Sequence, residues 1–314
     1  MADCNPSRVL VICGPTAVGK TEYAIKAARC FDGEIVSCDS MQIYKYMDIG
    51  SAKPTAEELA QATHHLVDFV DPRDDFSVAE YQTIARQTID DIISRGKLPV
   101  ISGGTGLYLN SVLYDMDFAN APKDQEYRRK LEQIEQEQGP GILHEMLREQ
   151  DPDAAAEIHP NNTKKIVRAL ERLREGEGTV EPFRNVVEPW PAYDPVLVGL
   201  TRDRQELYDR IDWRVEQLVE AGLVDEVQRL LDMGLSADNI SMKGIGYKEI
   251  IDYLNGGQTL EESVEIVKKN TRHYAKRQLT WFKRYDKINW YDISVHGGGE
   301  TALNEFIPWL KQRL

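Results

Sequence analysis

Short apolar runs alternate with amphipathic segments over the first third of the chain. The runs are rich in β-branched residues and lie at residues 8–13, 34–38, 64–70 and 98–102. Between them, apolar positions at helical spacing predict helices over 20–31 and 77–96. The second helix is expected to begin after the N-cap Ser77, with Glu80 completing a capping box, and to stop at Gly96. Strands that alternate with helices predict an α/β fold with a parallel sheet.

The pattern becomes helical and strongly charged over residues 123–176. A segment rich in Gly and Pro follows at 176–195 and predicts a linker. The apolar run 196–200 then restores the strand pattern, and helices follow, among them a long basic stretch at 259–285. The sequence therefore predicts an all-helical insertion over residues 117–190 within an α/β core formed by residues 1–116 and 191–314.

Composition and charge narrow the class of protein. The chain has 314 residues, of which 41% are hydrophobic and 29% charged, as in soluble globular proteins. No apolar run approaches the roughly 20 residues that span a bilayer, and the N-terminal run is too short for a signal peptide, so we expect a cytoplasmic protein. The net charge of −14 argues against a nucleic-acid partner. Residues 268–287, however, carry eight Lys or Arg against one Asp, and binding depends on such local clusters.

The four cysteines lie at positions 4, 13, 30 and 38 without a C-x-x-C pair. This spacing excludes a zinc module in the C-terminal half and argues against a disulfide framework. Cys13 and Cys30 are expected to pack as small apolar residues. His64 and His65 are neighbours on a predicted strand, where they point to opposite faces, so neither is expected to be a metal ligand.

Residues 14–21, GPTAVGKT, fit the phosphate-loop pattern G-x-x-x-x-G-K-[ST] between a strand and a helix. Backbone N–H groups and the helix N-terminus would bind phosphate oxygens, Lys20 would reach the outer phosphate, and Thr21 would bind Mg²⁺. The predicted phosphate-binding residues are Gly14, Pro15, Thr16, Ala17, Val18, Gly19, Lys20 and Thr21. The core is thus expected to be P-loop NTPase-like. A chance glycine-rich turn is the alternative, which the flanking strand and helix disfavour.

The loop by itself favours an ATP-dependent kinase. Such enzymes usually place an Asp at the end of a later strand to hold Mg²⁺. Here the strand at 98–102 ends in Gly103, Gly104 and Thr105, without a carboxylate. A small-molecule kinase is therefore weakened as an interpretation, but it remains open.

Asp39 follows the second predicted strand, in DSMQIY. Ligands of open α/β sheets collect at the carboxyl ends of the strands, so Asp39 is expected to share a crevice with the phosphate loop. Its carboxylate could bind Mg²⁺ through water or accept a proton from a nucleophile. An ordinary turn or N-cap Asp is the alternative. Ser40 and Gln42 supply groups able to read a base edge.

Eight motifs together resemble one family over nearly the whole chain. They are GPTAVGKT, DSMQIY, DIGSAKP (48–54), GGTGLY (103–108), NNTKKIVRALE (161–171), YDRIDWR (208–214), GIGYKE (244–249) and KRQLTWF (276–282). In this order they resemble the bacterial tRNA dimethylallyltransferases, also called tRNA isopentenyltransferases or the IPP transferase family. Ser51 stands where the family has Thr in GTAKP, which keeps the hydroxyl. The chain lacks cysteines for the C-terminal zinc finger that eukaryotic members often carry.

The resemblance implies a prenyl transfer that uses Mg²⁺. The dimethylallyl group of dimethylallyl diphosphate moves to N6 of adenosine-37 in tRNA, and diphosphate leaves. Lys20 would stabilise the leaving diphosphate, Asp39 would accept the amine proton, and Thr105 would orient the amine or line the passage between the substrates. For Thr105 the alternative is a helix N-cap.

Arg210 and Arg214 are four residues apart on a predicted helix, so they share a face. The family implies that an arginine of this helix clamps the diphosphate, and Arg214 is the first candidate. The alternative is a surface pair with Asp209 or Asp212.

The adenosine must be flipped out of the stacked anticodon loop to reach such a site, which costs free energy. Contacts between the protein and the tRNA phosphates must offset this cost. The expected tRNA-binding residues are Asp39, Ser40, Met41, Gln42 and Thr105 near the base; Arg128, Thr163, Lys164, Lys165, Ile166, Val167 and Arg168 on the insertion; and Lys269, Arg272, Lys276 and Lys283 on one face of the basic helix. The composition of the insertion by itself predicts helices exposed to solvent. The resemblance to the family implies instead that the insertion is a mobile clamp on the anticodon stem.

An aromatic stripe adjoins the basic row, at Tyr274, Gln278, Trp281 and Tyr285. It could stack on bases or be core, with core favoured for Trp281. Other functions remain in view: a small-molecule kinase, an adenylate isopentenyltransferase acting on free nucleotides, or an RNA-binding module with a vestigial loop. No membrane or protein partner is implied.

Overall fold

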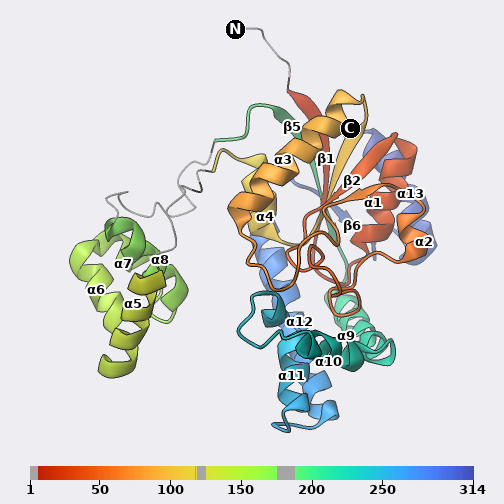
Figure 1. The fold of residues 1–314 in the computed structure, drawn as a ribbon. Coiled ribbons are helices and arrows are strands. Elements are labelled where there is room, and N and C mark those ends of the chain that lie inside the picture. The colour runs from red at the N-terminus through yellow and green to blue at the C-terminus, as the bar shows by residue number, and fades with distance from the viewer. Residues whose placement is uncertain (1–5, 117, 119–124, 175–187) are drawn as a thin grey trace. The chain divides into compact units, whose positions relative to one another are not determined.

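The computed structural model describes residues 6–116, 118, 125–174 and 188–314. The chain divides into two compact units (Figure 1). One comprises Met1–Tyr114 and Trp190–Leu314, and the other comprises Asp115–Pro189. Most of the expected linker at 176–195 lies outside the described residues.

The first unit is built on a parallel sheet in the order β3-β2-β4-β1-β5-β6. Its strands are β1 (Ser7–Cys13), β2 (Gly33–Ser37), β3 (His64–His65), β4 (Leu98–Gly103), β5 (Tyr193–Thr201) and β6 (Asn289–Asp292). The predicted α/β fold with a parallel, P-loop-type sheet is confirmed. The expected strand at 64–70 is shorter, because Leu66 and Asp68 both have a φ of +61° and turn the chain. The prediction missed β6, whose four residues carry too short a pattern.

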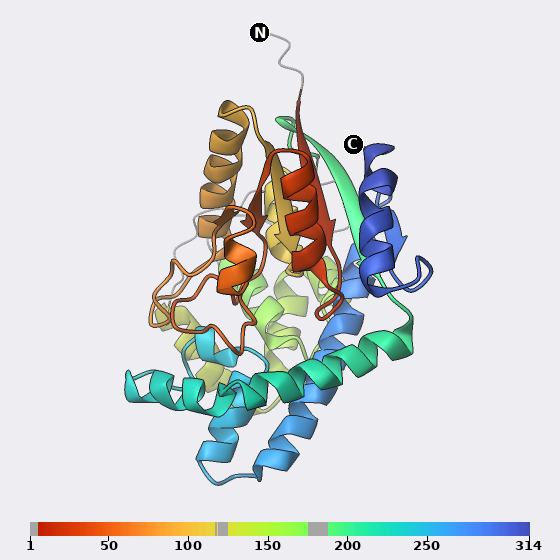
Figure 2. The ribbon, with the colours of Figure 1, turned by 90° about the vertical axis from the view of Figure 1, so that its right-hand side faces the viewer.

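Helices cover both faces of this sheet. Along β1, Leu10 and Ile12 point into one core cluster and Val9 and Val11 into another, as alternation in a strand requires. Helices α1 (Lys20–Cys30) and α13 (Gly299–Lys311) cover the first face, and α3 (Val78–Ser94) and α4 (Gly106–Leu113) cover the second. Figure 1 shows the two layers on either side of the strands, and Figure 2 looks onto the α1 and α13 side.

Helix α3 begins as the sequence predicts. The Ser77 hydroxyl accepts a hydrogen bond from the Glu80 N–H, and the Glu80 carboxylate accepts one from the Ser77 N–H. This reciprocal capping box satisfies two N–H groups that an isolated helix end would leave unpaired. Cys30, in contrast, is exposed at the end of α1, so the expectation that it packs in the interior is wrong. Cys13 is buried, as expected.

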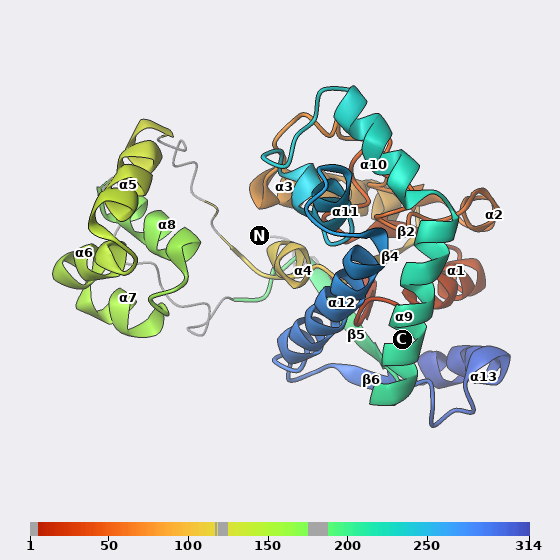
Figure 3. The same ribbon diagram turned by 90° about the horizontal axis from the view of Figure 1, so that it is seen from below.

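Further helices pack below the carboxyl ends of the strands. They are α9 (Arg204–Glu220), α10 (Leu223–Asp232), α11 (Tyr247–Leu254) and α12 (Leu260–Phe282), with the short 3-10 helix η1 (Ser241–Lys243), whereas the short helix α2 (Ala56–Leu59) lies beside α1. Figure 3 shows α9 and α12 side by side. Arg272 of α12 pairs with Asp212 of α9, and the Lys268 Nζ lies 2.8 Å from a Glu216 oxygen. The long basic stretch is thus one helix attached to the arginine-bearing helix.

The second unit is helical, with α5 (Gln125–Gln138), α6 (Ile142–Gln150), α7 (Pro152–Glu157) and α8 (Thr163–Arg174). The short helix α7 was not predicted; Asp151 caps it and Pro152 starts it. Ile166 is buried in the core of this unit, so its side chain packs and offers no surface for RNA. Arg128 forms a two-pronged ion pair with the buried Glu171.

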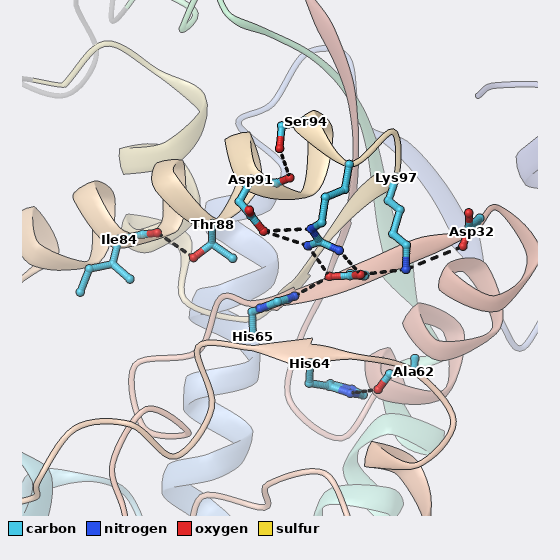
Figure 4. A network of polar contacts seen from close by, with 11 residues as sticks. Asp32, Ala62, His64, His65, Ile84, Thr88, Asp91, Ser94 and Lys97 are labelled. Atoms are coloured by element: carbon cyan, nitrogen blue, oxygen red, sulfur yellow. Dashed lines mark hydrogen bonds and ion pairs between the residues drawn. The ribbon is translucent and has the colours of Figure 1, made fainter.

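In the first unit, Glu34 at the amino-terminal end of β2 is a buried carboxylate (Figure 4). Arg95 makes a two-pronged contact with it, the Lys97 Nζ lies 2.9 Å away, and His65 Nε2 lies 2.7 Å away. Hydrogen bonds from Arg95 hold the pKa of Glu34 well below its usual range, against the effect of burial.

Among the described helices, none is both long and apolar enough to cross a membrane.

Candidate active site

Three loops meet at the carboxyl edge of the sheet, because β4 lies between β1 and β2. These are the phosphate loop after β1, the turn with Asp39 after β2, and the Gly103–Thr105 turn after β4. Glycine makes the close approach possible: a Cβ on Gly103 would lie 2.0 Å from the Cys38 oxygen. The Thr105 Oγ1 then accepts a hydrogen bond from the Ser40 N–H at 3.0 Å.

The phosphate loop turns its carbonyls outward. The Arg202 Nε donates to the Val18 oxygen at 3.0 Å, and the Arg210 Nε donates to the Ala17 oxygen at 3.1 Å. Ala17 has a φ of +63° and Gly14 a φ of +155°. Backbone that changes hand in this way directs successive N–H groups into one concave nest. The loop therefore presents amide donors to an anion while arginines hold its carbonyls.

Lys20 begins the helix that follows the loop, and its Nζ donates to the Pro15 oxygen at 2.8 Å. Burial, with a smaller effect from the charge of Arg214, lowers the pKa of Lys20 to about 8, although the Asp39 carboxylate opposes the shift. An ammonium with a lowered pKa beside a second cation is a site that favours an anion. Lys20, Asp39 and Arg214 thus come from three distant parts of the chain into one site.

Arg214 makes no hydrogen bond within the described part of the chain. The alternative surface pairs for it are wrong, since Asp212 pairs with Arg272 and Asp209 accepts from Gln205 instead. Burial lowers the pKa of Arg214, and Asp39 opposes the shift. The guanidinium of such a buried arginine has N–H donors that can form two parallel hydrogen bonds to the oxygens of a phosphate group.

Asp39 is held by its own turn through one oxygen only. Its Oδ1 accepts hydrogen bonds from the Met41 and Gln42 N–H groups, at 2.9 and 3.4 Å. Its Oδ2 has no hydrogen-bond partner among the residues that are described. The turn thus uses one oxygen of Asp39 and leaves the other available to a ligand.

Thr105 occupies the N-cap position of α4, but its side chain does not cap the helix. The hydroxyl faces Ser40, next to Asp39, and also donates to the Ser40 Oγ at 3.3 Å. Tyr274 of α12 adjoins this pair. Burial, followed by the Asp39 charge, raises the pKa of Tyr274 to about 12. Tyr274 consequently stays a neutral O–H group near neutral pH, beside the Asp39 carboxylate.

The oxygen atoms near Lys20 fit a magnesium ion. The Thr21 hydroxyl makes no hydrogen bond to any described residue, and Asp39 has its free oxygen. Thr21 lines a cavity of about 20 Å³ together with Ser37, Gln42, His64 and Ser102, about the room of one water. Magnesium prefers a few protein oxygens together with water and phosphate oxygens. Within the described ranges no cluster of three His, Cys, Asp or Glu offers a different metal site.

Comparison with known proteins bears on this site. A family model described as IPP transferase matches residues 42–285, and one described as isopentenyl transferase matches residues 7–74. A tRNA dimethylallyltransferase of Alkaliphilus oremlandii is 52% identical over 94% of both chains. One of Clostridioides difficile is 45% identical over 98% of both chains. The chain belongs to the IPP transferase family.

Solved structures agree with this family. The tRNA isopentenylpyrophosphate transferase of Bacillus halodurans aligns with a TM-score of 0.68 at 42% identity, over 97% of this chain and 99% of that one. A eukaryotic dimethylallyltransferase described as acting on tRNA aligns with a TM-score of 0.79 at 29% identity, over 91% of this chain and 74% of that one. The similarity thus covers nearly the whole chain, as expected for an IPP transferase.

Within this IPP transferase, the residues after Asp39 have mixed surroundings. The Gln42 amide donates to the Ala52 oxygen at 3.0 Å and accepts from the Ser37 Oγ at 3.2 Å. A base contact through this amide would use the second N–H of Nε2 or the second lone pair of Oε1. Met41 lies against Gly244, where a Cβ would come within 2.6 Å of the Met41 Cε. Ser40, beside Thr105, remains the residue of this turn that faces the site.

The basic row on α12 is only partly free. Lys269, Lys276 and Lys283 are exposed and have no ion pair in the part of the chain that the structure describes. Arg272 is already paired with Asp212. In the helical unit, Lys164 and Lys165 are exposed, whereas the other expected contacts are engaged or half-buried: Thr163 donates to Glu135, Arg168 lies 3.7 Å from Glu171, and Val167 packs against the core.

Two residues that hold the phosphate loop escaped the prediction. Arg202 directly follows the buried strand β5, and its Nε donates a hydrogen bond to the Val18 carbonyl oxygen. A basic residue directly after a buried strand, at the edge where ligands collect, was a signal that could have identified it. Gln278 was noted only within the aromatic stripe, yet its side chain contacts both the phosphate loop and the Gly104 turn.

A buried carboxylate fixes the loop that follows the Asp39 turn. Glu226 of α10 accepts hydrogen bonds from three successive N–H groups, those of Asp48, Ile49 and Gly50, at 2.7–2.9 Å. It also accepts from the Tyr247 hydroxyl at 2.8 Å. Glu226 is 1% exposed. Water therefore does not reach these N–H and O–H groups, and they would lose their hydrogen bonds if the carboxylate were removed.

We expect Glu226→Ala to lower the free energy of unfolding by about 3 kcal/mol, because four donors lose a charged acceptor while the loop can partly open to water. Urea unfolding followed by tryptophan fluorescence measures the change. Glu220→Ala removes an exposed carboxylate from the neighbouring helix and should change stability by at most about 0.5 kcal/mol. A loss from Glu226→Ala no larger than that of the control would contradict the anchoring role.

Proposed function

We propose that this protein transfers the dimethylallyl group from dimethylallyl diphosphate to N6 of adenosine-37 in tRNA, giving N6-dimethylallyladenosine and diphosphate. The observation that carries the proposal is the free Asp39 oxygen beside the phosphate-loop Lys20. The relatives named tRNA dimethylallyltransferase, and the neighbour described as acting on tRNA, support it. A tRNA substrate would place the reaction in the cytoplasm.

Breaking the allylic C–O bond leaves negative charge on the diphosphate. The loop N–H groups, Lys20 and the unpaired guanidinium of Arg214 would bind that charge as it develops, where burial strengthens each interaction. Thr21 would hold Mg²⁺, directly or with Asp39 through water, and the ion would supply further charge neutralisation. Arg202 and Arg210 would keep the loop carbonyls away from the anion.

The adenine amine is a poor nucleophile, because its lone pair is delocalised into the ring. A base that removes its proton during attack typically accelerates such a step by about 10²–10⁴-fold. Asp39 would accept the proton at Oδ2, since Oδ1 is occupied by the turn. Thr105 and the neutral Tyr274 would hold the amine side of the site through their hydroxyl groups.

The tRNA backbone would bind the exposed lysines of α12 and, through Lys164 and Lys165, the helical unit. Lys269, Lys276 and Lys283 are seven residues apart and lie on one face of the helix. Such a row can follow a phosphate backbone and offset the cost of flipping the adenosine out. Gln278 and Tyr285 are buried, so these two residues of the aromatic stripe pack inward and are not expected to stack on bases.

Affinity for an anticodon stem-loop should therefore fall with salt although the protein is acidic overall. We expect a slope of log affinity against log salt of about −4 for five lysine contacts, three on α12 and two on the helical unit. Lys276→Ala should reduce the slope by about one. Lys311→Ala removes one exposed charge from α13 and serves as the matched control. A flat salt response in wild-type protein would refute the basic-face contact.

The function is tested with labelled dimethylallyl diphosphate and Mg²⁺, offered with unmodified anticodon stem-loop or with AMP, ADP or ATP. We expect label on the stem-loop only, at N6 of the adenosine. Label on free nucleotides would instead indicate an adenylate isopentenyltransferase. A parallel reaction with γ-labelled ATP tests the kinase alternative, and any transfer of phosphate would contradict the proposal.

A further inference from the structure

One side chain joins the phosphate loop, the Gly104 turn and the RNA-facing helix. The Gln278 Oε1 accepts a hydrogen bond from the Thr16 N–H at 2.8 Å, and its Nε2 donates to the Gly104 oxygen at 2.9 Å. Thr16 lies in the phosphate loop, whereas Gly104 directly precedes Thr105. Both groups of one amide are thus used to join two loops that belong to different strands.

The contact is tight on both sides. Gln278 is 5% exposed, so a lost hydrogen bond would not be replaced by water. A Cβ on Gly104 would lie 2.3 Å from the Gln278 Nε2, and a Cβ on Gly106 would lie 2.3 Å from Trp281, one turn further along α12. Glycine at these two positions lets the turn lie directly on the helix. The turn and α12 therefore form one rigid contact.

The Thr16 N–H has a consequence for anion binding. Because Gln278 takes this donor, the diphosphate would bind the N–H groups of the later loop residues, Ala17 to Thr21. The amide also fixes where the loop leaves β1, and so where those donors point. Displacement of a substrate by about 1 Å can cost about 10²-fold in rate, so such a fixing contact matters for catalysis.

We propose that Gln278 is a positioning residue that aligns the diphosphate nest with the Thr105 turn, so that the leaving group and the accepting amine face each other. The inference rests on the proposed prenyl transfer. The helix that presents Lys269, Lys276 and Lys283 outward presents Gln278 inward. Helix α12 would therefore contact the RNA on one side and hold the diphosphate-binding loop on the other.

Two near-isosteric variants test this role. Gln278→Met removes both hydrogen bonds at similar volume. Gln278→Glu keeps an acceptor for the Thr16 N–H but sets a carboxylate oxygen against the Gly104 oxygen, until protonation restores a donor. Burial raises the pKa of such a carboxyl group, which brings its titration toward neutral pH. Thr280→Val, on the exposed side of α12, is the matched control, since its hydroxyl bonds only within the helix.

We expect Gln278→Met to lower kcat/KM for dimethylallyl diphosphate by about 100-fold at every pH between 6 and 8, with KM for the stem-loop changed less than about threefold. Gln278→Glu should show the same deficit at pH 8 and recover at least about tenfold at pH 6 relative to wild type. Thr280→Val should behave as wild type. A general packing defect would not produce recovery in acid.

Calorimetry with inorganic pyrophosphate and Mg²⁺, without RNA, gives a readout independent of the transfer reaction. Gln278→Met should weaken pyrophosphate by about tenfold, because the nest is no longer held. Wild-type pyrophosphate affinity in both variants, or a Gln278→Glu deficit that ignores pH, would overturn the proposal. If wild-type protein transfers nothing to the stem-loop, the proposed function fails instead, while the pyrophosphate comparison still tests Gln278.

Discussion

Asp39→Asn should lower kcat for prenyl transfer to the anticodon stem-loop by about 10²–10⁴-fold, the usual value of a general base. The amide oxygen of Asn can still accept the Met41 and Gln42 N–H groups, so the turn is preserved. What is lost is the basic oxygen at the Oδ2 position. Single-turnover assays with pre-bound substrates would measure the chemical step separately from binding.

Binding measurements separate this role from a binding role. Stem-loop affinity of Asp39→Asn should stay within about threefold of wild type, because the charge on the RNA is contacted elsewhere. Asp74→Asn, an exposed carboxylate on a nearby loop, should leave both quantities unchanged. Should Asp39→Asn keep its kcat while its RNA affinity collapses, Asp39 would be a binding group and the proposed chemistry would be wrong.

Lys20→Met should lower kcat by about 10²–10³-fold, since it removes a buried charged donor from the developing diphosphate. The side chain is otherwise close in length and volume, so the loop should keep its shape. Lys26→Met, six residues along the same helix, serves as the control, because Lys26 donates only to Asn304 among the residues that the structure describes. A Lys20→Met enzyme with wild-type kcat would show that the loop amides suffice.

The lowered pKa of Lys20, about 8, gives this residue a signature in the pH profile. Because the shift is downward, the ammonium charge is present below pH 8 and is lost as pH rises through that value. We expect kcat/KM for dimethylallyl diphosphate to fall about tenfold per pH unit above 8, since this parameter reports the free enzyme. The corresponding limb in kcat should lie higher, because bound diphosphate favours the charged form. The Lys20→Arg variant should lack this limb.

The fold was largely predictable, because its signals are local. The alternation of Val9, Leu10, Val11 and Ile12 reports a strand with two buried faces, and the Ser77–Glu80 capping box marks the start of α3. Short elements were lost: β6 and α7 have too few residues for a period to emerge. The strand expected at 64–70 ends early because positive φ angles at Leu66 and Asp68 override its apolar pattern.

The sequence by itself determined the candidate chemical groups: a phosphate loop with Lys20 and Thr21, a carboxylate directly after the second strand, and arginines one helical turn apart. Spacing within one strand or helix fixes such relations, so they can be read without coordinates. Only the tertiary structure decided that, among the described residues, one oxygen of Asp39 is free and Arg214 is unpaired while Arg272 is not, and that Gln278 joins two loops. These depend on contacts between segments up to 262 residues apart, and packing and burial, rather than local spacing, select among the partners that each side chain could have.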